Sequence, residues 1–365
     1  MKKSIYDIIA QEEYFKADMI RLLGVHGSHD IETLRCAAEK TLFDNCGKRV
    51  FFRGLIEFSN HCICDCNYCG IRKSNAAVRR YVLKKKEVVD SALFCAKQGY
   101  GSIVLQSGER EDDAFVTYVE DVVKTIKRET VSSVLPDGIG ITLCVGEQTR
   151  ETYERFFAAG AHRYLLRIES STPRLFEFIH PKTQKLQSRI ECLRTLKNIG
   201  FQVGTGVMIG LPTQTLEELA EDVLFFKDMD VDMIGMGPYI VHTETPMALH
   251  KDETAARHDE ILQLSLNMIA VTRLVLKNVN IASTTALQAM DATGREKGLL
   301  FGANVIMPQS TPTDVRNDYL LYEGKPCLDE NALQCKNCIE RRITSIGREP
   351  GYNSWGDSLH FSNCI

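Results

Sequence analysis

Four cysteines lie within eight residues of the chain, in the stretch HCICDCNYCG at positions 61–70. Cys62, Cys66 and Cys69 are separated by three and then by two residues, and Cys64 lies between the first two. Cysteine thiolates at such short spacings are ligands for zinc or for iron-sulfur clusters. The stretch therefore predicts a metal centre.

Three kinds of centre are compatible with this loop. A structural zinc site takes four protein ligands in a tetrahedron, so Cys64 or His61 would have to join the three spaced cysteines. A ferredoxin-type cluster is held by four cysteines in a run that ends in proline, and no proline follows Cys69 directly. A 4Fe-4S cluster with three cysteine ligands leaves one iron open, which is what a metal that binds a small molecule requires.

A second group of cysteines lies near the end of the chain, in PCLDENALQCKNC. Cys327, Cys335 and Cys338 again number three, which suggests an incomplete or exchangeable iron-sulfur cluster, 2Fe-2S or 4Fe-4S. The alternative is a zinc site whose fourth ligand is elsewhere, and Cys364 is a candidate for it.

Composition narrows the class of protein. The chain has 365 residues and a net charge of −4, which gives no electrostatic footprint for nucleic acid. Neither a signal peptide nor an apolar run of roughly 20 residues, as a membrane span needs, is recognisable. The 13 cysteines therefore indicate reduced thiols in a cytoplasmic protein, used for metal binding or catalysis.

The elements that would position these cysteines form a repeating pattern. Residues 1–48 read as helices, and eight apolar runs rich in β-formers then alternate with amphipathic helical stretches. The runs are 50–59, 102–108, 140–146, 163–170, 201–210, 233–240, 280–287 and 303–308.

This alternation predicts a parallel sheet in an α/β protein, and its length matches a complete (β/α)8 TIM-type barrel. An open doubly wound sheet is the alternative. We expect one structural domain with an N-terminal helical lead (1–48), a barrel (49–310) and a C-terminal extension (311–365) that carries the accessory cysteine site. The first cysteine loop follows the first strand, at the catalytic end of such a barrel.

The loop resembles the signature of the radical S-adenosylmethionine (SAM) superfamily, CxxxCxxC with an aromatic residue before the last cysteine, here Tyr68. In that superfamily the open iron of a 4Fe-4S cluster binds the amino and carboxylate groups of SAM. One-electron reduction then cleaves SAM to methionine and a 5′-deoxyadenosyl radical. The resemblance implies that Cys62, Cys66 and Cys69 are the cluster ligands and that Cys64 is a bystander.

Other strand ends add to this resemblance. Ser107, Gly108 and Glu109 close the second run, where the superfamily contacts the SAM amino group. Glu169 closes the fourth run, where a carboxylate can accept hydrogen bonds from the ribose hydroxyls; a surface salt bridge is the alternative. Met208 lies between two glycines of the fifth run, which would let the backbone approach adenine.

Longer strings resemble one group within that superfamily, the FeFe-hydrogenase maturases of the HydE type. They span residues 50 to about 350 and include RGLIEFSNHC, IVLQSGE, RYLLRIE, GVMIGLPTQT, STTAL and GANVIMP. Biotin synthase and methylornithine synthase share the barrel but differ in these strings. The resemblance implies that Arg167, Arg189 and Cys144 lie near SAM. It also implies an anion-binding cavity lined by Gln106, Thr142, Thr284, Thr285 and Arg295.

We further expect Arg167 and Glu169, two residues apart on one strand, to share a face and to find separate partners in SAM.

The resemblance also implies a role in assembling the di-iron active-site subcluster of FeFe hydrogenase. The substrate would be a small organometallic iron complex, and the radical would attack its sulfur. The expected partners are a reductant such as flavodoxin or ferredoxin and other hydrogenase maturases, with neither nucleic acid nor membrane among them. A radical SAM mutase of the methylornithine synthase type and a non-catalytic iron-sulfur carrier are the alternatives.

Overall fold

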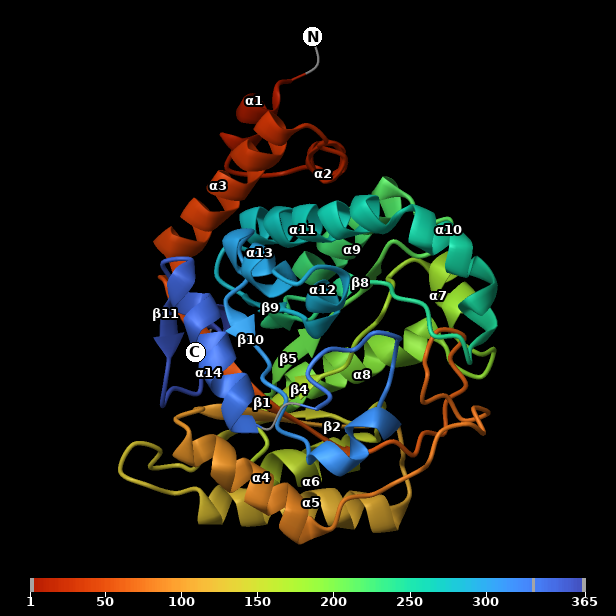
Figure 1. The fold of residues 1–365 in the computed structure, drawn as a ribbon, viewed down its shortest axis with the longest axis vertical. Helices are drawn as coiled ribbons and strands as arrows, with labels where there is room; N and C mark the ends of the chain where they lie inside the picture. The colour runs from red at the N-terminus through yellow and green to blue at the C-terminus, as the bar shows by residue number, and fades with distance from the viewer. Residues whose placement is uncertain (1–2, 330–331, 363–365) are drawn as a thin grey trace.

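A computed structural model describes residues 3–329 and 332–362, with side chains described for 3–329 and 338–362 (Figure 1). Eight parallel strands form a closed barrel, because the last strand of the series pairs with the first through Phe51 with Val305 and Phe52 with Ile306. The strands are β1 (Arg49–Ser59), β2 (Ser102–Ser107), β3 (Gly140–Cys144), β4 (Arg163–Leu165), β5 (Gln202–Thr205), β7 (Met233–Ile234), β9 (Asn280–Ser283) and β10 (Val305–Ile306). The predicted (β/α)8 barrel is confirmed, and the open sheet is excluded.

Several strands end earlier than their apolar runs suggest. β4 stops at Leu165 although the run continues to residue 170, and β9 stops at Ser283 although its run continues to residue 287. Beyond each strand the chain leaves the hydrogen-bonded sheet and lines the mouth of the barrel. Past β5 and β7 it forms a short second sheet of β6 (Met208–Ile209) and β8 (Gly237–Pro238).

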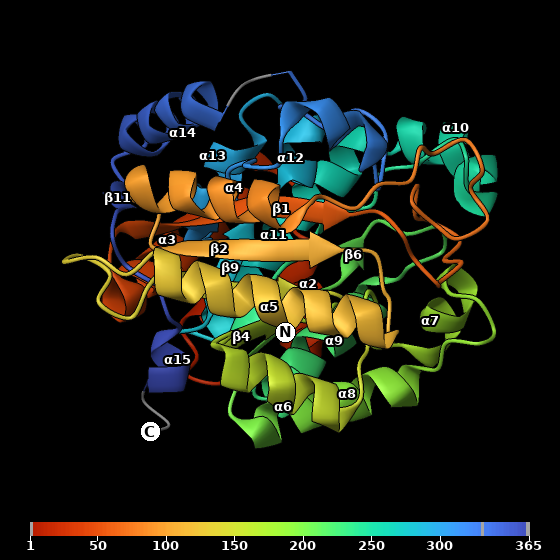
Figure 2. The ribbon, with the colours of Figure 1, turned by 90° about the horizontal axis from the view of Figure 1, so that it is seen from below.

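Helices surround the barrel and bury their apolar stripes against it. In α5 (Asp113–Glu129) the Asp112 side chain caps the start by accepting from the N–H of Phe115, and the buried side chains recur at helical spacing. Figure 2 shows α5 between its neighbours α4 and α6. The other helices between strands are α4 (Lys85–Lys97), α6 (Arg150–Ala159), α7 (Pro173–Ile179), α8 (Leu186–Ile199), α9 (Leu216–Asp228), η1 (Pro246–His250), α10 (Lys251–Ala256), α11 (His258–Val275), α12 (Thr285–Met290) and α13 (Gly294–Leu300).

The N-terminal helices pack on one side of this ring. They are α1 (Ile5–Ile9), α2 (Lys16–Leu23) and α3 (Ser28–Cys46). Of these, α3 packs against α11 (Figure 1). Asn267, buried on α11, donates to the carbonyl oxygens of Leu23 (3.0 Å) and Val25 (3.2 Å). These bonds tie the N-terminal helices to the outside of the barrel.

The C-terminal extension reaches both ends of the barrel. It comprises η2 (Thr313–Asp318), α14 (Ala332–Ser345), β11 (Glu349–Gly351) and α15 (Leu359–Ser362), with β11 added in parallel to β1. Near its end, Asp357 pairs with Arg163, the first residue of β4, which also donates to the Trp355 carbonyl (3.0 Å). The chain therefore closes the end of the barrel where the strands begin.

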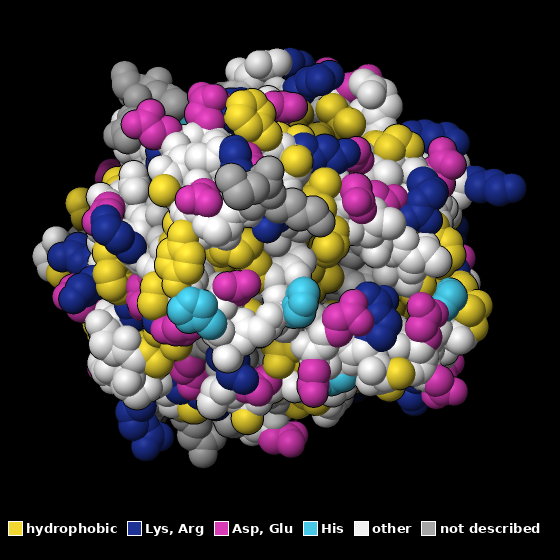
Figure 3. All heavy atoms as spheres, turned by 90° about the horizontal axis from the view of Figure 1, so that it is seen from above, with side chains coloured by type: hydrophobic (Ala, Val, Ile, Leu, Met, Phe, Trp, Pro, Cys, Tyr) yellow, Lys and Arg dark blue, Asp and Glu magenta, His cyan; other side chains and the backbone are white. Residues whose placement is uncertain are grey.

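Charges of both signs are mixed on one face of the molecule (Figure 3). On the face seen in Figure 3, acidic and basic side chains are interspersed, in keeping with the small net charge. Among the described residues, no helix is both long enough and apolar enough to span a bilayer.

Asp222 on α9 links the helical ring to the mouth of the barrel, and its charge should make stability depend on pH. Its Oδ1 accepts from the N–H (2.7 Å) and the hydroxyl (2.6 Å) of Ser171, two residues after Glu169. Burial raises the Asp222 pKa from its ordinary 3.8 to about 7. Between these values the folded protein holds a proton that the unfolded chain releases, so the free energy of unfolding falls as pH rises.

We therefore expect Asp222→Asn to remove a decline of at most about 1.4 kcal/mol per pH unit between roughly pH 4 and pH 7. Denaturant unfolding at several pH values measures it, with Asp228→Asn, at an exposed position of the same helix, as the control. Parallel pH profiles for wild type and Asp222→Asn would contradict the assignment.

Candidate functional site: a cavity at the mouth of the barrel

One cavity of about 260 Å³ opens where the barrel strands end. Its wall combines the cysteine loop, the ends of β2, β3 and β4, and a segment of the C-terminal extension. The sequence-predicted residues that line it are Cys62, Cys66, Tyr68, Cys69, Gln106, Ser107, Gly108, Glu109, Cys144, Arg167, Glu169, Arg189, Met208, Thr284 and Thr285.

The cysteine loop is held in shape by its own polar groups. Arg80 donates to the carbonyl oxygens of Asn60 (2.6 Å), Ile71 (2.8 Å), Arg72 (2.6 Å) and Asn75 (3.2 Å). Inside the loop, the carboxylate of Asp65 accepts hydrogen bonds from the side chains of Arg72 and Ser74. One guanidinium therefore fixes the start and the end of the loop, a role that the sequence did not reveal.

Two glycines let the loop approach its neighbours. A Cβ at Gly108 would lie 2.3 Å from the carbonyl oxygen of His61 and 2.8 Å from the Cβ of Cys62. A Cβ at Gly70 would lie 2.1 Å from the carbonyl oxygen of Leu320 in the C-terminal extension. No larger residue fits at either position, because the end of β2 and the C-terminal extension pack in direct contact with the cysteine loop.

The three spaced thiols influence one another across the cavity. Burial, with the negative charge of Cys69 next, raises the pKa of Cys66 well above its usual range. Burial and then the charge of Cys62 raise the pKa of Cys69 to about 12. A hydrogen bond from Cys64 lowers the pKa of Cys62 to about 7. Three thiolates here would repel one another, and iron would offset that repulsion and displace the protons.

These residues fit a cluster rather than a lone ion. In residues 3–329 and 338–362, no three His, Cys, Asp or Glu side chains are arranged to hold a single metal ion. The three spaced thiols nevertheless line one shared cavity, and the charge of one raises the pKa of another. Ligands placed around a group larger than a single ion would be arranged in this way. They are the thiols that would hold a 4Fe-4S cluster.

Arg189 on α8 joins the acids at the cavity wall. It is 7% exposed, and it donates to Glu147 Oε1 (2.8 Å), to the carbonyl oxygen of Arg167 (2.9 Å) and, at 3.5 Å, to Glu109 Oε2. The N–H of Glu147 also donates to Glu109 Oε2 (3.0 Å). Glu109 is thus oriented by two donors on one oxygen.

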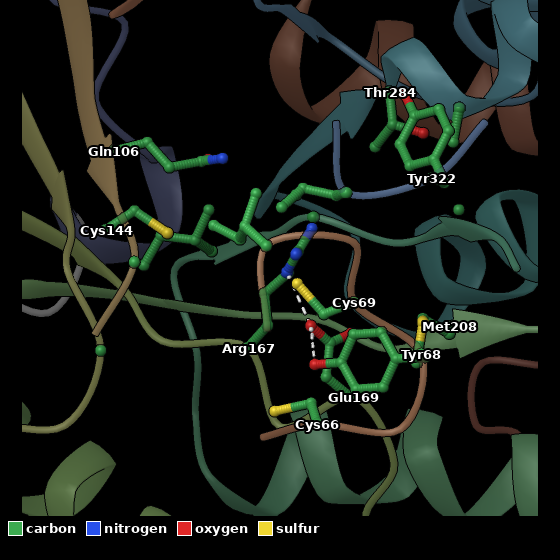
Figure 4. Close-up of a pocket in the computed structure, with 18 of the residues that line it drawn as sticks. Cys66, Tyr68, Cys69, Gln106, Cys144, Arg167, Glu169, Met208, Thr284 and Tyr322 are labelled. Atoms are coloured by element: carbon green, nitrogen blue, oxygen red, sulfur yellow. Dashed lines mark hydrogen bonds and ion pairs between the residues drawn. The ribbon is translucent and has the colours of Figure 1, made fainter. Parts of the chain in front are cut away.

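Arg167 and Glu169 both line the cavity, as expected for residues that share a face, and they also pair with each other. Arg167 Nε lies 3.0 Å from Glu169 Oε1, and the Tyr68 hydroxyl donates to the same oxygen at 3.4 Å (Figure 4). Both residues lie beyond β4, which ends at Leu165, and Glu169 has a left-handed φ of 62°. Glu169 is instead held by backbone bonds to Gly206 and Met208, and its side chain is nearly inaccessible.

The polar residues expected to bind anions separate into two places. Thr284 and Thr285 line the cavity, and Arg295 Nη2 donates to Thr285 Oγ1 (3.1 Å). Within the described chain, buried Thr284 Oγ1 and Arg295 Nε have no hydrogen-bond partner. In Figure 4 Thr284 lies beside Tyr322, away from Cys66 and Cys69.

Thr142 does not line this cavity. It borders a smaller one deeper in the barrel, where its hydroxyl accepts from Arg163 Nε at 3.0 Å. Gln106 and Cys144 line the main cavity on the side opposite Thr284 (Figure 4). Gln106 donates to the Tyr319 hydroxyl (3.3 Å), and burial raises the pKa of Cys144 to about 11.

A buried ion pair in the cavity wall was missed from the sequence. Lys325 Nζ lies 2.6 and 2.8 Å from the two carboxylate oxygens of Glu57 on β1, and Gln309 donates to the same carboxylate at 2.8 Å. Both charged side chains are less than 10% exposed. An acid inside the apolar run LIEFS signalled a buried partner, but not which residue supplies it.

The two accessory cysteines whose side chains are described, Cys327 and Cys338, do not line the cavity. Cys327 and Cys338 are half-buried, and Arg342 Nε donates to Cys338 Sγ at 3.3 Å. The side chain of Cys335 and all of Cys364 lie outside the described residues. A second cluster therefore stays a prediction.

Comparison with known proteins defines the class first. Residues 56–226, from β1 through α9, match the radical SAM superfamily. Biotin synthase 1 of Corynebacterium diphtheriae is 25% identical over 316 residues, which cover 85% of this chain and 83% of that one. The crystal structure of methylornithine synthase (PylB) superposes with a TM-score of 0.78 at 21% identity and covers 96% and 98% of the two chains, so it shares the fold.

The more specific family follows from a full-length relative. The FeFe hydrogenase maturase subunit HydE of Thermotoga maritima is 38% identical over 354 residues, 97% of each chain. The chain belongs to the radical SAM superfamily and, within it, to the HydE family. A 4Fe-4S cluster and SAM come with that superfamily, in agreement with the three thiols that share the cavity.

The Glu57–Lys325 pair should hold the C-terminal extension over the cavity. We expect Lys325→Met to lower the free energy of unfolding by about 3–5 kcal/mol, because it leaves a buried carboxylate without its cation. The double variant Glu57→Gln/Lys325→Met should recover much of this loss, since neither charge remains.

Denaturant unfolding measures these changes. Lys86→Met, which breaks an exposed ion pair on α4, is the control and should stay close to wild type. A Lys325→Met protein as stable as wild type would show that the pair does not hold the extension.

Proposed function

We propose that the chain reductively cleaves SAM at a 4Fe-4S cluster and uses the resulting radical in the assembly of the di-iron active-site subcluster of FeFe hydrogenase. The observation that carries the proposal is the single cavity that joins the three thiols, the acids at the ends of β2 and β4, and the threonine pair. The 38% identity to a HydE protein along nearly the whole chain supports the assembly role.

The bound cofactors would supply a primary-carbon radical when an electron reaches the cluster. The chain's own task is to hold SAM so that its groups meet fixed partners. Glu109, oriented by Arg189, is a partner for the SAM amino group, and Glu169 is a partner for the ribose hydroxyls. Arg167 then balances the Glu169 charge and, with its side chain 37% exposed, remains able to reach the SAM carboxylate.

The part of the cavity near Thr284 and Thr285 is the proposed place of the substrate. The Thr284 hydroxyl, which lines the cavity, and Nε of Arg295, which donates to Thr285 through Nη2, have no hydrogen-bond partner among the described residues. Such donors suit an anionic ligand such as an iron complex that carries carbonyl and cyanide groups. An electron donor such as flavodoxin or ferredoxin and other hydrogenase maturases complete the proposal as partners.

Two alternatives are less well supported. A mutase of the methylornithine synthase type shares the barrel, but that likeness stands at 21% identity and concerns the fold alone. A non-catalytic cluster carrier would have no use for paired acids and an arginine arranged behind the cysteine loop. The HydE relative, by contrast, is 38% identical over 97% of each chain.

Removal of one cluster ligand tests the cofactor assignment. Cys66→Ala, reconstituted without oxygen, should lose the iron-sulfur absorption and the formation of 5′-deoxyadenosine, because two thiolates cannot hold the cluster. Absorption spectra and product chromatography measure both. Cys36→Ser, which changes an exposed thiol on α3, is the control; 5′-deoxyadenosine at the wild-type rate from Cys66→Ala would refute the assignment.

Glu169 provides a separate test of SAM binding. Glu169→Ala should weaken SAM binding roughly 10- to 150-fold, the usual effect of losing a hydrogen bond to a charged group. The spectrum of the reduced cluster without SAM should hardly change, since Glu169 bonds to Arg167 and Tyr68 and not to a cysteine. Titration of the spectral change on SAM binding gives the affinity. Glu177→Ala, at an exposed acid on α7, is the control, and equal affinities would assign Glu169 a structural role.

A further inference from the structure

The outer side of the cysteine loop reaches the surface, and three exposed lysines border it. Lys73 follows the loop, and its N–H donates to the carbonyl oxygen of Cys64 at 2.8 Å. Lys182 and Lys185 lie on either side of Gln184, whose Nε2 donates to the Cys64 sulfur at 3.0 Å. These three residues, the loop lysines, are therefore held next to the loop by short contacts.

The loop lysines do not stabilise the fold. Within the described chain none of them forms an ion pair, whereas Lys86 on α4 and Lys124 on α5 each pair with an acid one turn away. Lys185 is the N-cap residue of α8, which has no acidic side chain in its first turn. The N-terminus of a helix carries a partial positive charge, so a lysine there is repelled. A charge placed at a cost to its own helix indicates a partner outside the chain.

The charge around the loop is uneven. Two acids beside it are neutralised by arginines, Asp65 by Arg72 at 2.8 Å and Glu147 by Arg189 at 2.8 Å. Glu177 is exposed on α7, so the loop lysines leave an excess of positive charge on the side of α7 and α8. Exposed acids at positions 111 and 113 follow the end of β2. This distribution would orient a charged partner.

The cysteine loop is also where an electron has to arrive. Its inner side, with Cys66 and Cys69, forms part of the wall of the cavity, which SAM would fill. A carrier protein cannot enter a cavity of about 260 Å³, so it can approach the thiols only from the outer side. There Asn67, between two cysteines, donates to the carbonyl oxygen of Phe178 on α7 at 2.8 Å. Figure 2 shows α7 at the end of the barrel toward which the β2 arrow points.

We propose that the loop lysines form the docking surface for an acidic one-electron carrier protein of the flavodoxin or ferredoxin kind. A carrier with negative charge around its redox group complements the loop lysines, and such complementarity speeds encounter and sets orientation. The docked carrier gives up one electron and is oxidised, the cluster is reduced, and no bond breaks at this step. The docking surface rests on the proposed function, because it needs a cluster at the thiols.

Charge reversal tests the docking surface in the full chain. One variant changes all three loop lysines to Glu. The control variant changes three other exposed lysines to Glu, and therefore alters the net charge equally. The control lysines have no ion pair in the described chain either, and they lie at or just past the C-terminal ends of α4, α9 and α11, at the opposite end of the barrel; they are Lys97, Lys227 and Lys277.

Two measurements are made on each protein over a range of salt concentrations. Calorimetry gives the affinity for purified flavodoxin and, separately, for a 2Fe-2S ferredoxin, with and without the cluster. Stopped-flow absorption gives the rate at which each reduced carrier reduces the rebuilt cluster. Reduced methyl viologen, a small cation that needs no docking surface, is the comparison reductant.

At low salt the loop-lysine variant should bind the carrier about tenfold more weakly and accept its electron about 10- to 1,000-fold more slowly. The difference should shrink as salt is added, because screening weakens the attraction in wild type. Methyl viologen should reduce this variant at least as fast as wild type, and the control variant should match wild type with every reductant. The carrier that shows these effects is the occupant of the surface.

Equal carrier affinities in wild type and the loop-lysine variant would overturn the docking surface, and so would an equal loss in the control variant or a wild type that binds neither carrier. Affinity measured without the cluster decides the matter if the variant loads no iron. A wild type that is reduced through the loop lysines but forms no 5′-deoxyadenosine would uphold the surface and refute the proposed function. Formation of 5′-deoxyadenosine with methyl viologen, together with carrier binding that ignores the loop lysines, would refute the surface alone.

Discussion

The mouth of the barrel depends on one constraint: charges withdrawn from water must be paired. Arg189 satisfies this for several elements at once, since it holds Glu147 after β3, Glu109 after β2 and the main chain at Arg167 after β4. Because one guanidinium makes all three contacts, the ends of these strands cannot shift independently. The acids that face the cavity are therefore oriented before any ligand arrives, which lowers the cost of binding one.

Much of this arrangement could be predicted from the sequence, because it follows from local patterns. Eight buried parallel strands read as apolar runs, and the cysteine spacing lies directly after the first of them. What the runs could not give is where a strand ends. β4 is only three residues long, and the left-handed conformation of Glu169, four residues further on, leaves no mark in an apolar pattern.

Pairings between distant residues were also beyond the sequence. An acid within an apolar strand, such as Glu57, indicates that a partner exists, but Lys325 lies 268 positions away. Thr142 lies inside the barrel, and its partner Arg163, 21 positions away, is set by the pairing of β3 with β4. A charged residue in an apolar strand predicts a buried counterion, but only the fold determines which residue supplies it.

The C-terminal extension determines how closed the barrel interior is. Across the end where the strands begin, a Cβ at Gly101 would lie only 1.8 Å from the Ser354 carbonyl oxygen, and Asp357 neutralises buried Arg163. At the mouth, Lys325 and Tyr319 from the same extension form part of the cavity wall. Radical chemistry benefits from such closure, because excluded water can neither quench an intermediate nor weaken the electrostatic contacts that hold it. Cys327 and Cys338 lie between these two closures along the chain and do not line the cavity. These two thiols therefore belong to the cover and not to the wall of the cavity.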